Sequence, residues 1–208
     1  MSVARGRLIS FEGIDGAGKS SRIGETAAWL AARGHAVEQT REPGGTLLGE
    51  ELRALLLHTA MAADTEMLLM FAARAEHLAQ RIRPALAAGR WVLSDRFSDA
   101  SFAYQVGGRG LAAERCTALE QWVHADFAPD LTFLFDIDPA IAAVRMAASR
   151  DEGDRFEREQ RDFFARVRAA YLERAETAAA RFVVLDATEA PERLQARIHE
   201  ALATRLAA

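Results

Sequence analysis

The stretch that decides the fold is RLISFEGIDGAGKS, residues 7–20. It opens with a short apolar run (7–11) of the length of a buried strand, and a glycine-rich segment (13–18) follows almost at once. Over residues 19–33 the apolar positions recur at helical spacing, and Gly34 is a candidate stop for that helix. The stretch therefore predicts a strand, a tight glycine turn and a helix in succession.

The glycine turn has the pattern of a phosphate-binding loop, because residues 13–20 match G-x-x-x-x-G-K-[ST]. Glycines allow the backbone to wrap an anion with its N–H groups pointing inward. We predict that Lys19 reaches the β and γ phosphates of a nucleotide and that Ser20 offers its hydroxyl to Mg²⁺. A chance glycine turn is the alternative, but a predicted strand and a predicted helix flank this one.

The use of basic residues supports the same interpretation. Of the 26 basic residues, all but Lys19 are arginine, so the compact ammonium occurs only where the motif requires it. The sequence also has no asparagine, which argues against a guanine-specific switch GTPase, since its N-K-x-D motif needs that residue. A motor or translocase needs more chain than 208 residues. These observations favour a small phosphotransferase with a second, phosphate-accepting substrate.

Composition predicts one globular domain spanning residues 1–208. Half of the residues are apolar and 27% are charged, which excludes a disordered or collagen-like chain. The one cysteine, Cys116, cannot form an internal disulfide, so we expect a cytoplasmic protein. We expect no membrane partner, because no apolar run approaches the roughly 18 residues of a membrane span. The net charge of −4 disfavours nucleic acid as a partner.

Strand and helix patterns alternate along the chain, which predicts a three-layer α/β/α fold on a mostly parallel sheet. We predict strands at 7–11, 37–40, 91–94, 131–135 and 182–185. We predict helices at 19–33, 49–57, 64–88 (with Asp64 as a candidate N-cap), 112–125, from Pro139, from the end of a charged loop (149–154) to about 180, and 191–206. The active site of such a sheet lies at the carboxyl ends of its strands. Polar residues follow the strands there: Glu12, Arg41, Glu42, Asp95, Arg96 and Asp136.

Four further segments accompany the phosphate loop: TREPGGT (40–46), DRF (95–97), YQVGGRG (104–110) and DRFE (154–157). With these segments in this order, residues 7–186 resemble the bacterial thymidylate kinase family. The resemblance implies transfer of the γ-phosphoryl group of ATP to dTMP. It also implies a P-loop kinase fold with a five-stranded parallel sheet, a short lid, Mg²⁺ and a homodimer. The residues assigned to ATP are Gly13, Ile14, Asp15, Gly16, Ala17, Gly18, Lys19 and Ser20.

The resemblance assigns roles near the transferred phosphate. It implies that Arg96 holds the phosphate of dTMP, and that Asp95 lies near Mg²⁺ with Ser20. Asp15 is expected to lie near the acceptor nucleotide. A surface ion pair is the alternative for Asp95 and Arg96, and an acid that favours a helix N-terminus is the alternative for Asp15. Phosphoryl transfer needs such groups, because two anions must be held together in line.

Other matched positions are expected to bind the rest of dTMP. Glu42 and Arg53 would surround its phosphate. Tyr104 would pack against the deoxyribose. The residues expected to read the thymine edge are Arg74, Ser101 and Gln105, of which the last two share one face if they lie on a helix. Ordinary loop, surface or core packing is the alternative for each.

The sequence departs from the family at the residue that stacks on thymine. Many members have an aromatic residue four positions before the arginine, where this chain has Met70. The phenylalanine here is Phe71, three positions before Arg74. Both spacings lie on one helical face, so either side chain could cover the base. We predict that Phe71 does.

The lid is predicted at about 146–156. One subtype of the family carries an arginine in the phosphate loop, at the position that corresponds to Gly16 in this chain. The other subtype supplies that arginine from the lid, and Arg150 is the candidate, with Arg155 in reserve. The predicted catalytic residues are thus Lys19, Asp15, Arg96 and Arg150. The alternative for the lid is a solvated, charged loop. The alternatives for the function of the chain are a P-loop kinase of another small acceptor and a nucleotide-binding module without enzyme activity.

Overall fold

The computed structural model describes residues 5–147, 155–156, 159 and 161–206, and within them a five-stranded parallel sheet forms the centre. The strands run in the spatial order β2-β3-β1-β4-β5, so the strand before the phosphate loop lies in the middle. Their bounds are β1 (Leu8–Glu12), β2 (Val37–Arg41), β3 (Trp91–Asp95), β4 (Leu131–Asp136) and β5 (Phe182–Asp186). The predicted fold class is confirmed.

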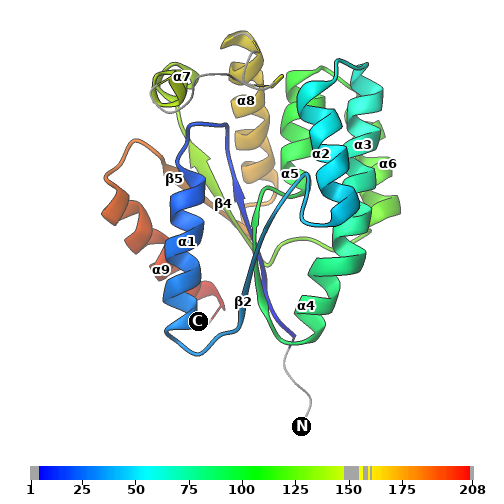
Figure 1. The fold of residues 1–208 in the computed structure, drawn as a ribbon. Coiled ribbons are helices and arrows are strands. Elements are labelled where there is room, and N and C mark those ends of the chain that lie inside the picture. The colour runs from blue at the N-terminus through cyan, green and yellow to red at the C-terminus, as the bar shows by residue number, and fades with distance from the viewer. Residues whose placement is uncertain (1–4, 148–154, 157–158, 160, 207–208) are drawn as a thin grey trace.

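Helices cover both faces of the sheet (Figure 1). One face carries α1 (Lys19–Ala31) and α9 (Pro191–Leu206). The other carries α4 (Arg83–Ala87), α5 (Ser98–Ser101) and α8 (Arg161–Thr177), with two π-helical segments, η1 (Leu78–Ile82) and η2 (Phe102–Gly108). Three helices lie beyond them, α2 (Leu47–His58), α3 (Ala63–His77) and α6 (Ala113–Val123), while α7 (Pro139–Ala147) lies near the carboxyl ends of the strands.

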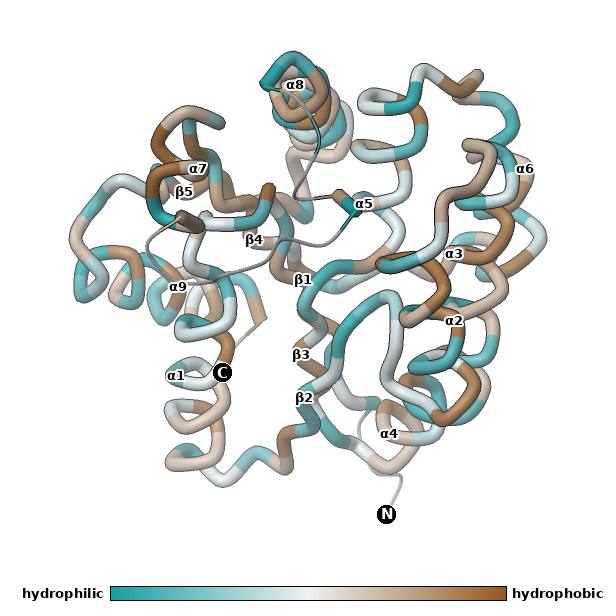
Figure 2. Tube along the Cα trace, turned by 45° about the horizontal axis from the view of Figure 1, so that its top comes forward, coloured by the Kyte–Doolittle hydropathy of each residue, from teal (hydrophilic) through white to brown (hydrophobic). Residues whose placement is uncertain are grey.

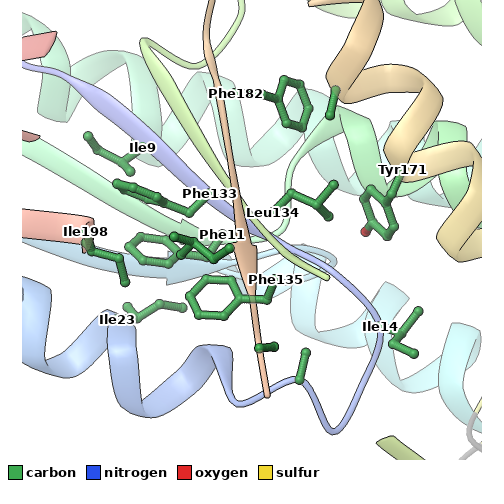
Figure 3. Packing of buried hydrophobic residues seen from close by; sticks show 14 of the residues in the cluster. Ile9, Phe11, Ile14, Ile23, Phe133, Leu134, Phe135, Tyr171, Phe182 and Ile198 are labelled. Atoms are coloured by element: carbon green, nitrogen blue, oxygen red, sulfur yellow. The ribbon is translucent and has the colours of Figure 1, made fainter. Parts of the chain in front are cut away.

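The inner strands β1, β3 and β4 are mostly apolar and buried because helices cover both of their faces, whereas the edge strand β2 is mostly polar. In Figure 3 the side chains of Ile23 on α1 and Ile198 on α9 lie beside Phe11 and Phe133 of the sheet. The rings of Phe11 and Phe133 pack with their centroids 5.5 Å apart. This packing fixes the central strand, and with it the start of the phosphate loop.

Several element boundaries differ from the prediction. The helix predicted over residues 64–88 is divided into α3, η1 and α4, because Pro84 lacks the N–H that would continue the hydrogen-bond ladder. Asp64 is not the N-cap of α3, since Ala62 precedes the first turn. The start of α2 precedes the prediction by two residues, because the Thr46 side chain accepts from the Gly49 N–H at 3.0 Å. The helix over 191–206 is confirmed.

Two further observations concern the chain as a whole. No helix in the described part of the chain is long and apolar enough to cross a membrane. Of the predicted lid, residues 148–154 lie outside the described residues, so the interpretation of that loop as a lid stays a prediction.

Gly13 allows the phosphate loop to pass close to the neighbouring strand. Its φ is +131°, and a Cβ atom there would lie 2.5 Å from the carbonyl oxygen of Phe135. Gly18 also has a positive φ, +86°, but a Cβ atom there would meet no described atom within 4 Å. Both positions therefore need a glycine for its backbone conformation, but only Gly13 needs one for the close contact with β4 as well.

We expect Gly13→Ala to destabilise the fold by about 2–4 kcal/mol, because it adds a clash with a strand to a disfavoured backbone conformation. Gly18→Ala is the matched control and should cost only about 1–2 kcal/mol, since it adds no clash. Urea unfolding of both variants measures the difference. Equal losses in the two variants would show that the contact with Phe135 does not limit this position.

Candidate active site

A cleft of about 990 Å³ opens at the carboxyl ends of the strands. In Figure 2, α1, α7 and α9 lie on one side of β1, and α2, α3 and α6 lie on the other. The predicted site residues that line the cleft are Asp15, Gly16, Gly18, Lys19, Ser20, Glu42, Arg53, Arg74, Asp95, Arg96, Ser101, Tyr104 and Gln105. The structure thus brings together residues from five separate segments of the sequence.

The phosphate loop holds its lysine in place without a ligand. Lys19 Nζ donates to the carbonyl oxygens of Gly13 at 3.1 Å and Ile14 at 3.2 Å. Burial lowers the pKa of the Lys19 ammonium, and the positive charge of Arg96 adds to this effect. The side chains of Ile14 and Ala17 pack into the core, so these two residues can offer only backbone groups to a phosphate. An arriving phosphate chain would replace the carbonyl partners of Lys19.

Arg96 adopts a left-handed backbone conformation, with a φ of 73°. Such a conformation is unfavourable for a residue with a side chain and persists only where its surroundings enforce it. Here the Arg96 N–H donates to the Phe11 carbonyl at 3.0 Å, and the Ser94 hydroxyl donates to the Arg96 carbonyl at 2.6 Å. The next N–H, of Phe97, donates to Glu12 Oε1 at 2.7 Å. These bonds turn the side chain back over the sheet edge, toward the phosphate loop.

The guanidinium group of Arg96 connects three elements of the site. Its Nη2 donates to Asp15 Oδ1 at 2.9 Å and to the Tyr104 hydroxyl at 3.0 Å. Its Nη1 donates to the hydroxyl of Tyr171, on α8, at 3.0 Å. Asp15 and Arg96, each predicted separately, are therefore in direct contact. Tyr171 was not predicted, and no spacing in the sequence identifies it.

Glu12 lies completely buried at the end of β1, directly before the phosphate loop. Its Oε2 accepts a hydrogen bond from the Tyr171 hydroxyl at 2.9 Å. Burial raises the pKa of the Glu12 carboxyl to about 8, and the negative charge of Asp99 adds to the rise, while Arg96 opposes it. The Glu12 carboxyl group holds the backbone next to Arg96, because it accepts a hydrogen bond from the N–H of Phe97, and this is a supporting contact rather than one with a substrate.

Arg74 is held rigidly on the opposite wall. Its Nε donates to Glu42 Oε2 at 2.7 Å, and its Nη2 donates to the Phe97 carbonyl at 3.2 Å and to Ser101 Oγ at 3.0 Å. The buried Glu42 carboxyl has a lowered pKa; burial would raise it, but Arg74 and His77 outweigh that effect. Within the described residues, Arg74 Nη1 has no hydrogen-bond partner. A buried donor without a partner is costly, which points to a ligand acceptor.

Like Arg74, Gln105 has side-chain atoms both with and without a hydrogen-bond partner among the described residues. Its Nε2 donates to Glu66 Oε1 at 2.8 Å, and the side chain is fully buried. Its Oε1 has no hydrogen-bond partner among residues 5–147, 155–156, 159 and 161–206. One donor and one acceptor therefore remain for a ligand in the same cleft. Glu66 was not predicted, although an acidic residue beside an apolar helical stretch was a visible signal.

The structure places Phe71 and Met70 in different surroundings. Phe71 is 2% exposed and packs in a core cluster with Met67 and Cys116. Met70 lines the cleft and is only partly buried. Consecutive helical residues point about 100° apart, so the two side chains face different surroundings. Phe71 does not line the cleft in this structure, because its ring completes the packing between α3 and α6, and its predicted contact with the base stays a prediction.

The remaining predicted residues are placed as follows. Arg53 lies on α2 and donates from Nη1 to the Pro43 carbonyl at 3.0 Å. The Glu42–Pro43 peptide bond is cis. Arg150 lies outside the described residues. Arg155 is described, and its guanidinium group binds the Leu56 carbonyl and Glu66, on the same side of the cleft as Arg74.

Ser20 and Asp95 fit a magnesium site that is completed by phosphate. Both line the cleft, and Asp95 Oδ1 is a buried oxygen for which the described residues supply no hydrogen-bond partner. Mg²⁺ commonly takes one or two protein oxygens and fills its other positions with phosphate and water. No group of three or more histidine, cysteine or acidic residues in the described part of the chain could hold a metal ion by itself.

Comparisons with known proteins agree with this geometry. The family model described as thymidylate kinase matches residues 11–198. Thymidylate kinase from Thiobacillus denitrificans is 60% identical over 193 residues, which cover 93% of this chain and 94% of that protein. Thymidylate kinase from Cupriavidus metallidurans is 56% identical over 200 residues, covering 96% and 99%. The crystal structure of thymidylate kinase from Ehrlichia chaffeensis is similar with a TM-score of 0.77 at 30% identity, covering 95% and 99%.

The raised pKa of Glu12 predicts how stability changes with pH. The folded protein keeps a proton on Glu12 up to about pH 8, whereas the unfolded chain releases it near 4.5. Raising the pH across this window therefore favours unfolding, and the loss ends above pH 8. Glu12→Gln mimics the protonated group, so we expect the wild type to lose up to about 1 kcal/mol per pH unit relative to this variant. Urea unfolding of both proteins from pH 5 to 9 measures this, and a constant difference would contradict it.

Proposed function

The chain belongs to the thymidylate kinase family, and on this premise we propose that its cleft transfers the γ-phosphoryl group of ATP to dTMP. The observation that carries the choice of acceptor is the pair of unpartnered groups, Arg74 Nη1 and Gln105 Oε1, within the described cleft. Thymine presents the complementary pair, since its O4 accepts a hydrogen bond and its N3–H donates one. The chain is thus a nucleoside monophosphate kinase.

On the donor side, the phosphate loop would hold the phosphates of ATP. Its backbone N–H groups and the N-terminus of α1 attract anions, and Lys19 would neutralise charge on the transferring group. Ser20 and Asp95 would hold Mg²⁺ together with the phosphates of ATP. When bound, Mg²⁺ supplies positive charge to the β and γ phosphate oxygens.

On the acceptor side, Arg96 would bind the phosphate of dTMP. Its guanidinium group is already oriented by two tyrosine hydroxyls and by Asp15, so little reorganisation is needed. Arg53 would add a second positive charge, and Glu42 would position Arg74. This arrangement would put cations between two anionic substrates, and phosphoryl transfer requires such screening and alignment.

The nucleoside of dTMP would occupy the wall formed by α3 and the segment 98–108. Arg74 would donate to O4 of thymine, and Gln105 would accept from N3–H. Ser101 would keep Arg74 in position, because its hydroxyl already accepts from Nη2. Met70 would cover the face of the base with its polarizable sulfur. Tyr104 would pack against the deoxyribose, since it lines the cleft between this wall and Arg96.

We further propose three properties that the family suggests. Arg150 would act as an arginine finger from the lid over about 146–156. The chain would form a homodimer, and exposed leucines support this, because Leu48 and Leu55 lie on α2 and Leu68 lies on α3, two helices that pack against each other. Finally, we place the enzyme in the cytoplasm, in keeping with its single buried cysteine.

A coupled assay of ADP release tests the proposed function. The acceptors offered in parallel are dTMP, dUMP, dCMP, dGMP, dAMP and shikimate. We expect dTMP to be preferred, with dUMP weaker by the roughly 1–3 kcal/mol that one methyl group supplies. Lys19→Ala is the control, since it should fold normally but lose about 10²–10³-fold in turnover. Equal use of dCMP and dTMP would exclude thymidylate as the specific acceptor, and preference for shikimate would replace it.

The position of Met70 gives a second prediction. We expect Met70→Ala to raise KM for dTMP about tenfold, because the base loses one covering side chain but the fold keeps its core. Phe71→Ala should instead lower the free energy of unfolding by about 3–5 kcal/mol, since it empties a core position. Steady-state kinetics and urea unfolding of both variants separate the two effects. A larger KM change in folded Phe71→Ala would restore Phe71 as the covering residue.

A further inference from the structure

Glu66 is a fully buried carboxylate on α3 that touches the proposed thymine site only through another side chain. Its Oε1 accepts the hydrogen bond from Gln105 Nε2 at 2.8 Å. Its Oε2 lies 2.7 Å from Arg155 Nη1, and Arg109 Nε lies 3.2 Å from both oxygens. Three donors thus converge on one carboxylate, two from the C-terminal part of η2 and its cap and one from Arg155.

This environment decides which way the amide of Gln105 points. Every group that the structure places against the Glu66 oxygens is a nitrogen donor, and a carboxylate accepts hydrogen bonds and cannot donate them. The amide nitrogen of Gln105 must therefore face Glu66. The amide oxygen is then left as the group without a described partner. A flipped amide would place two oxygens together and would be strongly unfavourable.

Two arginines hold Glu66 itself in place. Arg109 follows η2 and also pairs with Glu159, while Arg155 is anchored by its Nε, which donates to the Leu56 carbonyl at 3.0 Å. The Arg155 N–H donates to the Leu57 carbonyl at 3.1 Å. The carboxylate is thus constrained from the side of η2 and from the side of α2. A buried charge with this many partners has little freedom to move.

We propose that Glu66 is a positioning residue that determines base specificity by fixing Gln105 as a hydrogen-bond acceptor. The proposal rests on the proposed function, because it assumes that Gln105 meets the N3–H of thymine. Glu66 does not contact the base. It prevents Gln105 from presenting its amide N–H groups in place of its oxygen.

The consequence is discrimination between thymine and cytosine. Thymine offers an acceptor at O4 and a donor at N3, whereas cytosine offers a donor at N4 and an acceptor at N3. A freely rotating Gln105 could satisfy N3 of either base. A fixed Gln105 leaves N3 of cytosine facing an oxygen, and Arg74 leaves the N4 amino group facing a donor. Two mismatches in a buried site reject a ligand far more strongly than the loss of one contact.

The test is the ratio of kcat/KM for dTMP to that for dCMP in the wild type, Glu66→Gln and Glu66→Asp. We expect Glu66→Gln to lower the ratio by about tenfold or more, mainly through loss of activity on dTMP, because its amide no longer dictates the orientation of Gln105. Glu66→Asp keeps the charge between the arginines but withdraws it by one methylene, so a smaller fall in the same direction is expected. Circular dichroism and thermal unfolding establish which variants fold.

The matched control is Glu159→Gln, which removes a carboxylate from Arg109 but does not touch Gln105, and its ratio should equal that of the wild type. In a Gln105→Leu background, Glu66→Gln should change the ratio no further, since the residue through which it acts is absent.

Equal losses on both nucleotides in folded Glu66→Gln would overturn the proposal and leave Glu66 a purely structural role. If Glu66→Gln does not fold, an unchanged ratio in Glu66→Asp has the same meaning. A fall of equal size in Glu159→Gln, or a further fall in the Gln105→Leu background, also overturns it. A wild type that does not prefer dTMP would instead refute the proposed function, so the two failures are distinguishable.

Discussion

The buried carboxyl group of Glu12 is the feature on which the arrangement of the cleft depends. It ends the central strand, so the phosphate loop begins at the next residue. It accepts a hydrogen bond from the N–H of Phe97, which holds the left-handed turn that directs Arg96 across the sheet edge. It also accepts a hydrogen bond from the hydroxyl of Tyr171, which connects the end of β1 to α8. The phosphate loop and Arg96 are therefore both tied to one side chain.

Much of the fold could be predicted because its signals are local. The strand and glycine turn around Gly13 are encoded within fourteen consecutive residues, residues 7–20, and the helix follows from Lys19 onward. The division of the long helix near Pro84 was harder, because apolar periodicity continues through the π-helical segment η1. The helical segment 98–108 was missed because its residues satisfy tertiary contacts, with Gly108 against Phe163 and Tyr104 against Arg96. Local propensity carries little of that information.

The residues of the candidate site also fall into two groups, those with a local sequence signal and those placed by contacts between distant segments. Lys19, Asp95 and Arg96 stand at strand ends and in a motif, so their position in sequence implies their position in space. Glu66 and Tyr171 act through contacts between segments that are 39 and 75 residues apart, and no pattern in one sequence encodes such pairs. Met70 and Phe71 are adjacent in the chain, and only the packing of α6 against α3 decides which one reaches the cleft.

The unequal use of the two basic side chains has a chemical consequence. Buried carboxylates here are held by arginine forks: Glu42 by Arg74 and Asp99 by Arg174 and Arg181. Guanidinium groups do not react with acylating agents under mild conditions, because they remain protonated. Lys19 is therefore the only side-chain amine that an active ester or an acetyl donor can modify. It is 5% exposed and bonded to two carbonyl oxygens, so such reagents encounter a shielded target. Modification at the Lys19 side chain, scored apart from the α-amino group, therefore reports on the opening of a single loop.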